Sequence, residues 1–187
     1  MAHPGYVWVY GDIGEKANNV ITLRDSVNWV VMHAATGEVV DEIVVVITSG
    51  GGSVYDSLAM YDYLVLLKPK YKITTVASGF CMSAAVVLLQ AGDTRWAGTG
   101  TMFMTHAPLF VFREGTRFNG TDAKEARKSL ANTNKRLINI IARRMGKNYK
   151  HIAWMFTDKE YYFDSPEAMQ RGFVDKFFLD GRYKNGQ

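Results

Sequence analysis

The sequence predicts an α/β protein in which buried strands alternate with helices. Along the 187 residues, short runs of β-branched and aromatic residues are followed by segments with apolar residues at helical spacing. Two of these runs end in glycine-containing turns, at residues 49–52 and 78–79. Such alternation favours βαβ units built on a parallel sheet.

The first half of the chain predicts two strand and helix pairs. Residues 6–10 (YVWVY) are typical of a strand, and residues 22–35 have the apolar spacing of a helix. Residues 43–47 form a continuous β-branched run, as expected of a strand covered on both faces. Residues 54–67 then predict a helix that ends shortly before Pro69.

The middle of the chain predicts a strand, a turn, a buried helix and a further strand. Residues 73–77 are typical of a buried strand, and residues 78–83 (SGFCMS) predict a turn. Residues 84–90 predict a buried helix, and residues 101–105 a strand with His106 at its end.

The last third predicts one long helix and several short elements. Residues 109–120 are expected to be irregular or hairpin-like, and Thr121 and Asp122 are candidate caps of a helix that reaches residue 145. A helix of this length in a small domain often projects towards a partner. A shorter helix, a loop over residues 157–168 and a last strand near residues 173–178 complete the chain, which we expect to form one domain over residues 1–187.

Composition narrows the class of protein. Apolar residues make up 48% of the chain, and the net charge of +4 comes from scattered Lys and Arg, so no nucleic-acid partner is expected. One cysteine excludes an intramolecular disulfide and indicates a reducing compartment. No signal peptide and no apolar run of about 20 residues is visible, so we expect a soluble cytoplasmic protein without a membrane partner.

The residues able to do chemistry follow the predicted strands. Gly50, Gly51 and Gly52 either form only a tight turn or present free N–H groups to an anion. Ser83 enters the buried helix, where a lone serine is more often an N-cap than a nucleophile. His106, at the end of the next strand, is the base that favours the nucleophile.

Two further roles stay open at this level. Cys81 competes with Ser83 as nucleophile, but its apolar neighbours favour an inert core cysteine. A carboxylate that orients the histidine could come from Asp158, Glu160 or Asp164.

Several segments resemble, in order and at similar spacing, the proteolytic subunit of the Clp protease family (ClpP). ITSGGGSV at residues 47–54 resembles INSPGGSV, and GFCMS at 79–83 with LLQAG at 88–92 is similar to GQAAS with LLAGG. MYD at 60–62 with KP at 68–69, MTHAP at 104–108, and SPEA with GFVD at 165–175 resemble IYD with KP, MIHQP, and APEA with GLVD.

The resemblance implies a serine peptidase that hydrolyses peptide bonds through an acyl-enzyme, with no metal or bound cofactor. Ser83 would be the nucleophile and His106 the base, with the N–H groups of Gly52 and Ala84 as oxyanion hole and Gly51 and Gly52 binding substrate. The family's third member is an aspartate; a glutamate, Glu160, stands at that position here, with Asp158 as the alternative acid.

Other departures concern the same turns. Glycine at position 50 replaces the family's proline, and Ala84 replaces its methionine. Phe80 and Met82 are bulkier than their counterparts and are expected to reshape the substrate pocket.

The resemblance also implies a fold and an assembly. The fold would be a ClpP/crotonase-like ββα superhelix with a head (about 6–108 and 150–180) and a protruding handle (about 109–149). Handles would join two heptameric rings into a tetradecamer that encloses the active sites and receives unfolded proteins and peptides. An AAA+ unfoldase of the ClpX, ClpA or ClpC type is the expected partner, but only five residues precede Tyr6 where the family has axial loops, so peptides are expected to enter without it.

Two rival functions are considered. A non-catalytic ring subunit of a mixed barrel would usually lack the serine or the histidine. A crotonase-fold acyl-CoA enzyme would carry acidic catalytic residues where Ser83 and His106 stand.

Overall fold

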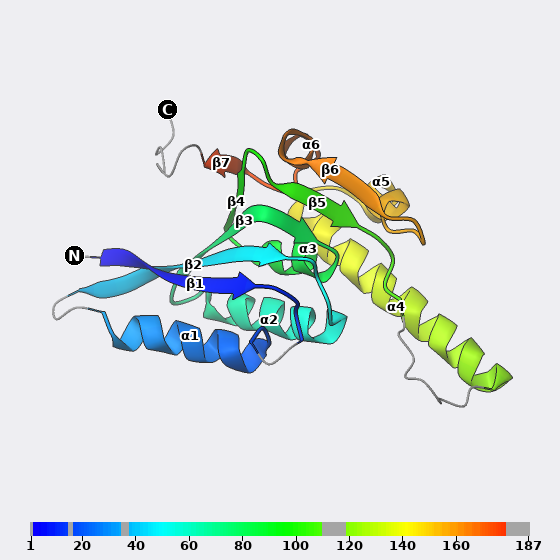
Figure 1. Ribbon diagram of the computed structural model, residues 1–187, viewed down its shortest axis with the longest axis horizontal. Coiled ribbons are helices and arrows are strands. Elements are labelled where there is room, and N and C mark those ends of the chain that lie inside the picture. Colours follow the sequence, from blue (N-terminus) through cyan, green and yellow to red (C-terminus); the bar gives the residue numbers. More distant parts are fainter. Residues whose placement is uncertain (1, 15–16, 35–37, 110–118, 179–187) are drawn as a thin grey trace.

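The computed structural model describes residues 2–14, 17–34, 38–109 and 119–178. In these residues, helices cover one face of a seven-stranded sheet and one long helix projects from it (Figure 1). The elements in chain order are β1 (Ala2–Tyr10), α1 (Val20–Met32), β2 (Val39–Ser49), α2 (Val54–Leu67), β3 (Lys72–Met82), α3 (Ala84–Leu89), β4 (Thr94–Gly98), β5 (Met102–Thr105), α4 (Gly120–Arg144), α5 (Tyr149–Ile152), η1 (Ala153–Met155), β6 (Tyr161–Asp164), α6 (Ser165–Arg171) and β7 (Lys176–Phe178).

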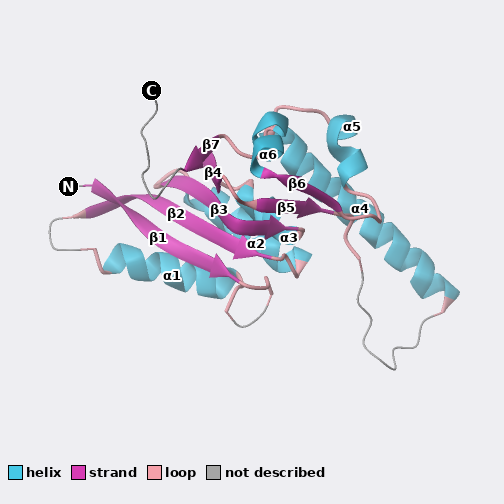
Figure 2. Cartoon of the chain, turned by 45° about the horizontal axis from the view of Figure 1, so that its top comes forward, coloured by secondary structure: helices cyan, strands magenta, loops and turns pink. Residues whose placement is uncertain are grey.

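The sheet is mainly parallel, as the alternation of strands and helices predicts. Its main path runs β1-β2-β3-β4-β7, and each neighbouring pair on this path is parallel. Strand β5 also lies parallel to β3, and β6 pairs with β5 in the antiparallel direction (Figure 2). Because β2, β3 and β5 run the same way, their carboxyl ends meet at one edge.

On the side away from β2, strand β3 pairs with two strands in succession, and here the predicted turn at residues 78–83 is wrong. Residues 74–77 pair with β4, whereas residues 80–82 pair with β5. The glycine of this segment, Gly79, has a φ of +71°, and the register against β2 shifts at this level. The segment is therefore a kink inside a strand, since pairing with β5 extends β3 to Met82.

The core lies between the sheet and helices α1 to α4. Ile43, Val45 and Ile47 of β2 belong to its main cluster, as does every residue of α3, so the predicted buried helix is confirmed. The alternate residues Val44 and Val46 face the other side, where they pack with Val76, Trp96 and Phe178. In Figure 1, none of the described helices covers this second face.

Helix α4 is anchored at one end only. Its buried residues are Leu137, Ile138, Ile141 and Ala142, all in its C-terminal half. The N-terminal half extends beyond the sheet (Figure 1). Asn119 caps the helix and Asp122 completes a capping box, so the cap predicted at Thr121 is corrected by two residues. Most of the region expected to be irregular, 110–118, lies outside the described residues.

Two short strands and one helix were not predicted. Strand β4 was missed, and the expected loop over 157–168 contains β6 and the start of α6. Both strands are at most five residues long, so their pairing partners, more than their composition, determine them. The last strand is confined to Lys176–Phe178, the residues that pair with β4, and Phe173 and Val174 are buried before it begins.

An ion pair between the buried Arg95 and the partly exposed Asp175 links the C-terminal segment to β4. Arg95 is 4% exposed, and its Nε donates to the Asp175 carboxylate at 3.0 Å. The Arg95 N–H donates to the same carboxylate at 2.8 Å, and Nη1 donates to Gln90 at 2.6 Å. Burial alone would raise the pKa of Asp175, but the hydrogen bonds from Arg95 lower it below its ordinary value.

Candidate active site

Three strand ends bring the candidate residues to one edge of the sheet. Strand β2 leads into Gly50, Gly51 and Gly52, β3 leads into Ser83, and β5 leads into His106. In open parallel sheets the crevice beyond the carboxyl ends of the strands is the usual ligand site.

Ser83 occupies the N-cap position of α3 but does not cap it. Its side chain makes no capping hydrogen bond, and its N–H donates to the Met104 carbonyl at 2.7 Å. Ser83 is the one non-glycine residue with positive φ in the described part of the chain, with φ 52° and ψ −120°. A strained serine at a sharp turn from strand to helix favours the nucleophile over the N-cap.

The Ser83 hydroxyl lies against the imidazole of His106. Oγ and Nε2 are 2.7 Å apart, so the hydroxyl donates to Nε2 when the ring holds its proton on Nδ1. The chain on either side of His106 is held by the segment after α5. Thr105 Oγ1 donates to the Met155 carbonyl, and the Ala107 N–H donates to the Thr157 carbonyl, both at 2.8 Å.

The glycine turn packs against the backbone of Ser83. Gly51 and Gly52 have φ values of +103° and +127°, which glycine adopts without strain. A Cβ on Gly51 would lie 2.7 Å from the Ser83 Cβ and 3.0 Å from the Ala84 nitrogen. Hydrogen bonds to Ile13 hold the turn, with Ile13 N–H to Gly51 O at 2.7 Å and Ser53 N–H to Ile13 O at 2.8 Å.

Two N–H groups at this edge remain available to a ligand. Among the described residues, neither Gly52 nor Ala84 donates its N–H to another group. They flank Ser83, one in the glycine turn and one in the first turn of α3. Free backbone N–H groups beside a nucleophile are suited to a developing oxyanion.

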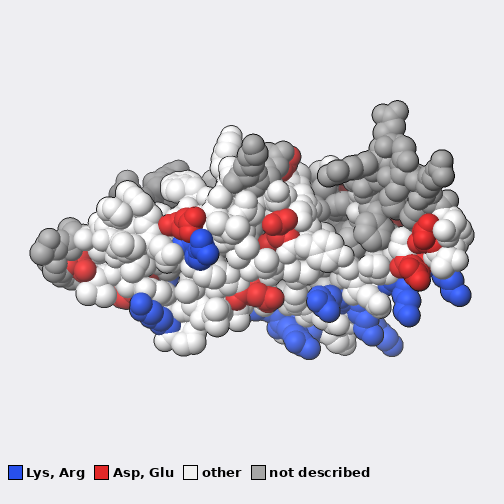
Figure 3. Space-filling model, turned by 90° about the horizontal axis from the view of Figure 1, so that it is seen from below, with Lys and Arg blue, Asp and Glu red and all other residues white. Residues whose placement is uncertain are grey.

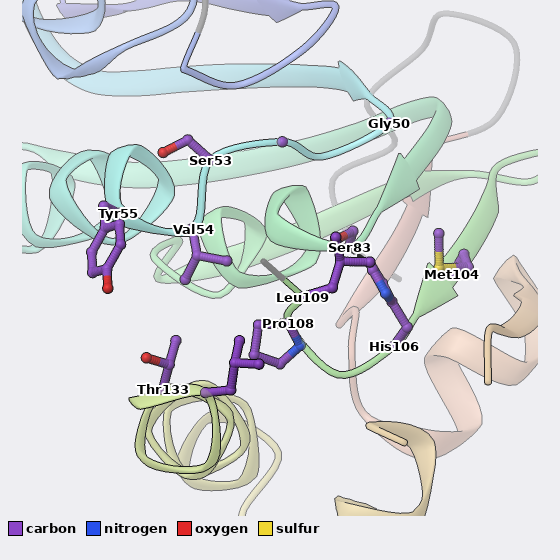
Figure 4. Close-up of a pocket in the computed structure, with 12 residues that line it drawn as sticks. Gly50, Ser53, Val54, Tyr55, Ser83, Met104, His106, Pro108, Leu109 and Thr133 are labelled. Atoms are coloured by element: carbon purple, nitrogen blue, oxygen red, sulfur yellow. Dashed lines mark hydrogen bonds between the residues drawn. The ribbon is translucent and has the colours of Figure 1, made fainter. Parts of the chain in front are cut away.

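Ser83 and His106 both line a cleft of about 600 Å³ (Figure 4). Apolar side chains, among them Val54, Pro108, Leu109 and Leu130, line much of it. Phe80 and Met82 do not line the cleft, because the extension of β3 directs this segment into pairing with β5. The expectation that these two residues reshape the pocket is therefore not met among the lining residues.

The structure does not bring a carboxylate to His106 within the residues that it describes. Among these residues, the His106 ring forms its hydrogen bond with Ser83. The Glu160 carboxylate instead accepts from the Tyr162 hydroxyl at 2.9 Å. Thr105 pairs with Tyr161 in the antiparallel ladder, so the next residues along are His106 and Glu160, which places Glu160 nearby.

The other two carboxylate candidates lie elsewhere. Asp158 is exposed in a bend, and Asp164 accepts from the Glu167 N–H at 2.9 Å as the N-cap of α6. Tyr162 was not predicted as a site residue, although its place two residues after Glu160 puts both side chains on one side of a strand.

Cys81 is a core residue. It is fully buried, pairs with Phe103 of β5, and does not line the cleft. Burial raises the pKa of its thiol well above the ordinary value, so the nucleophilic thiolate is suppressed.

Nothing in the described ranges is arranged as a metal centre or a membrane span. No three His, Cys, Asp or Glu side chains there are grouped so as to hold a metal ion. No helix in those ranges is long and apolar enough to cross a bilayer.

Fold and site together define a class: a crotonase-like α/β protein with a Ser–His pair at the strand ends, the arrangement that serine hydrolases use. The profile of the Clp protease family matches residues 22–180, and the chain belongs to that family.

Curated relatives carry the same family name. The ATP-dependent Clp protease proteolytic subunit of Porphyromonas gingivalis (strain W83) is 29% identical over 143 residues, which cover 75% of this chain and 61% of the relative. The subunit of the same name from Bacteroides fragilis is 29% identical over 140 residues, covering 74% and 64%. The match thus spans under two thirds of these relatives.

A solved structure shares the fold. A point mutant of ClpP1 from Listeria monocytogenes superposes with a TM-score of 0.78 at 20% identity, covering 95% of this chain and 92% of that one. At this identity the likeness shows the ClpP/crotonase-like fold that the sequence resemblance implied.

Proposed function

We propose that the protein is a serine endopeptidase subunit of the Clp protease type. The observation that carries the proposal is the 2.7 Å contact between Ser83 Oγ and His106 Nε2 in the lining of the cleft. Membership in the Clp protease family supports it, as do the relatives named as proteolytic subunits.

The proposed reaction proceeds in two steps. In the first step, His106 Nε2 takes the Ser83 proton while Oγ bonds to the carbonyl carbon, and the oxyanion accepts from Gly52 and Ala84 N–H. His106 then returns the proton to the amide nitrogen, the C–N bond breaks, and an acyl-enzyme remains. Water, deprotonated by His106, releases the acid and restores Ser83 in the second step. Neither step uses a metal or bound cofactor.

Glu160 is proposed to orient His106 during these steps. A carboxylate at Nδ1 keeps the proton there and stabilises the imidazolium that forms. The strand register supports this role, because Thr105 and Tyr161 are paired, His106 follows Thr105 and Glu160 precedes Tyr161. The contact would require the Glu160 side chain to rotate away from Tyr162. Asp158, exposed in the preceding bend, is the alternative acid.

Assembly and partners follow the family. We propose self-association into heptameric rings and a tetradecamer, with the projecting half of α4 as handle. The uncovered sheet face presents exposed Tyr6 and Trp8, which suits docking of an AAA+ unfoldase. The substrates would be unfolded proteins and peptides in the cytoplasm.

Active-site labelling tests the proposal. A fluorophosphonate probe should label the assembled protein and the Cys81→Ala variant, and should not label Ser83→Ala. Short fluorogenic peptides should be cleaved by the labelled forms only. If assembled wild type shows neither labelling nor cleavage, a structural ring subunit replaces the peptidase.

A second pair of variants identifies the acid. Glu160→Ala should lower kcat by about 10²-fold with assembly intact, because the imidazole loses its orienting carboxylate. Asp158→Ala should be close to wild type. The reverse order would assign the role to Asp158.

A further inference from the structure

A second hollow continues the cleft. It measures about 490 Å³ and lies between the first turn of α2 and the projecting part of α4. Tyr55 of α2 and Thr133 of α4 line both hollows. In Figure 4 these two side chains lie on the side of the cleft away from Ser83. We call this second hollow the α2–α4 groove, and a peptide that left the cleft on that side would enter it.

The α2–α4 groove differs from the cleft in charge. Lys128 and Arg136 line it, both are exposed, and neither forms an ion pair with another described residue. Glu125 is the carboxylate in its lining. Over its length α4 carries seven Lys and Arg against two Asp and Glu. Figure 3 shows Lys and Arg gathered on this face of the molecule where α4 lies.

We propose that the α2–α4 groove binds acidic side chains of the peptide substrate, so that the enzyme favours Asp or Glu a few residues from the cleaved bond. The inference rests on the proposed peptidase function and deepens it. An extended peptide advances about 3.3 Å per residue, so a chain held at Ser83 reaches the groove within a few residues. Lys128 and Arg136 then meet a substrate carboxylate at exposed positions, where each ion pair is modest and sensitive to salt.

The first experiment uses matched fluorogenic peptides that differ only by Glu or Gln at the second to fifth positions on either side of the scissile bond. We expect kcat/KM of wild type to be about fivefold higher for the best-placed Glu peptide than for its Gln partner, as one or two screened ion pairs allow. The ratio should fall towards one in roughly 0.5 M salt, which screens such pairs. Equal values at every position would overturn the proposal.

Variants with altered charge in the α2–α4 groove test whether the Glu preference arises there. Lys128→Glu with Arg136→Glu should remove or reverse the Glu preference while sparing the Gln peptide, and Glu125→Gln should strengthen it. Arg127→Glu is the matched control, because Arg127 is exposed on the same helix and does not line the groove. An Arg127→Glu variant that loses the preference equally would contradict a groove-specific site.

A binding measurement separates this proposal from the peptidase itself. With Ser83→Ala, fluorescence anisotropy should show about fivefold tighter binding of the Glu peptide than of the Gln peptide. If wild type cleaves no peptide but this difference in affinity persists, the proposed acidic-peptide site is supported and the proposed peptidase function is refuted. Cleavage with equal affinities would refute the groove alone.

Discussion

At the scale of single residues, Gly51 controls the position of Ser83. Its φ of +103° and its contact with the Ser83 turn leave no room for a side chain. Gly51→Ala should therefore lower kcat at least tenfold and cost about 1–3 kcal/mol of stability, because the turn must move. Peptide hydrolysis and thermal unfolding measure the two effects.

Gly50→Ala is the matched control for this substitution. Gly50 has no positive φ, and its added Cβ would meet only Asp12 Oδ1 at 3.7 Å, an ordinary contact. A Gly50→Ala variant as impaired as Gly51→Ala would show that the turn as a whole, and not this contact, limits activity.

Tyr162 competes with His106 for the proposed acid. The Tyr162 hydroxyl donates to the Glu160 carboxylate at 2.9 Å, and this hydrogen bond raises the pKa of the hydroxyl. Tyr162→Phe frees Glu160, so kcat for a fluorogenic peptide should rise about two- to tenfold. The rise should vanish in Glu160→Gln with Tyr162→Phe. A fall in kcat would mean that Tyr162 orients Glu160 productively.

At this scale, the sequence predicts some of the site residues but not all of their interactions. Gly51, Ser83 and His106 could be proposed from residue type and from their places after strands. The hydrogen bond from Tyr162 to Glu160 could not, because it depends on rotamers and on a strand that the sequence did not predict.

At the scale of elements, strands with long apolar runs were predictable and short ones were not. Residues 43–47 indicate β2 by composition alone, since the side chains on both faces of that strand are buried. Strand β6 begins YYF, and its place is set by pairing with β5 and by packing of Phe163 against Phe103 and Phe173. Such partners are distant in sequence, so no local pattern shows them.

Helix α4 offers a prediction of its own because its N-terminal half has no buried residues. Asn119 Oδ1 accepts from the N–H groups of Thr121 and Asp122 at 2.8 and 3.0 Å. Asn119→Ala should weaken this end by about 1 kcal/mol, with amide exchange near residues 121–124 about fivefold faster and the global Tm unchanged.

The Asn119→Asp variant should show the same amide hydrogen exchange as wild type, because aspartate is an equally good N-cap. Faster exchange that extended to Ile138 would show that the two halves of α4 unfold together.

At the scale of the whole molecule, the Arg95–Asp175 pair makes stability depend on pH. The pKa of Asp175 is lowered in the folded state, so its contribution is complete above its unfolded value of about 4 and is lost as pH falls towards the folded value. Asp175→Asn should cost about 3 kcal/mol at pH 7, at the lower end for a buried pair because 34% of the Asp175 side chain is exposed.

Urea unfolding of wild type from about pH 7 to about pH 2.5 measures this dependence. In the Asp175→Asn variant, the free energy of unfolding should fall less steeply below about pH 4 than in wild type. The Asp41→Asn variant, changed at an exposed position on β2, should show the same fall as wild type. An unchanged acid slope in Asp175→Asn would assign the decline to other carboxylates.

The hydrogen bonds that hold the chain around His106 determine when, during synthesis, the proposed peptidase could become active. Thr105 and Ala107 are held by Met155 and Thr157, and β5 finds its partner β6 only at residue 161. Some fifty residues must therefore leave the ribosome after His106 before its strand is held in place. The proposed peptidase, assembled in this order, would stay inactive towards the nascent chains around it, and towards its own, until its translation is almost complete.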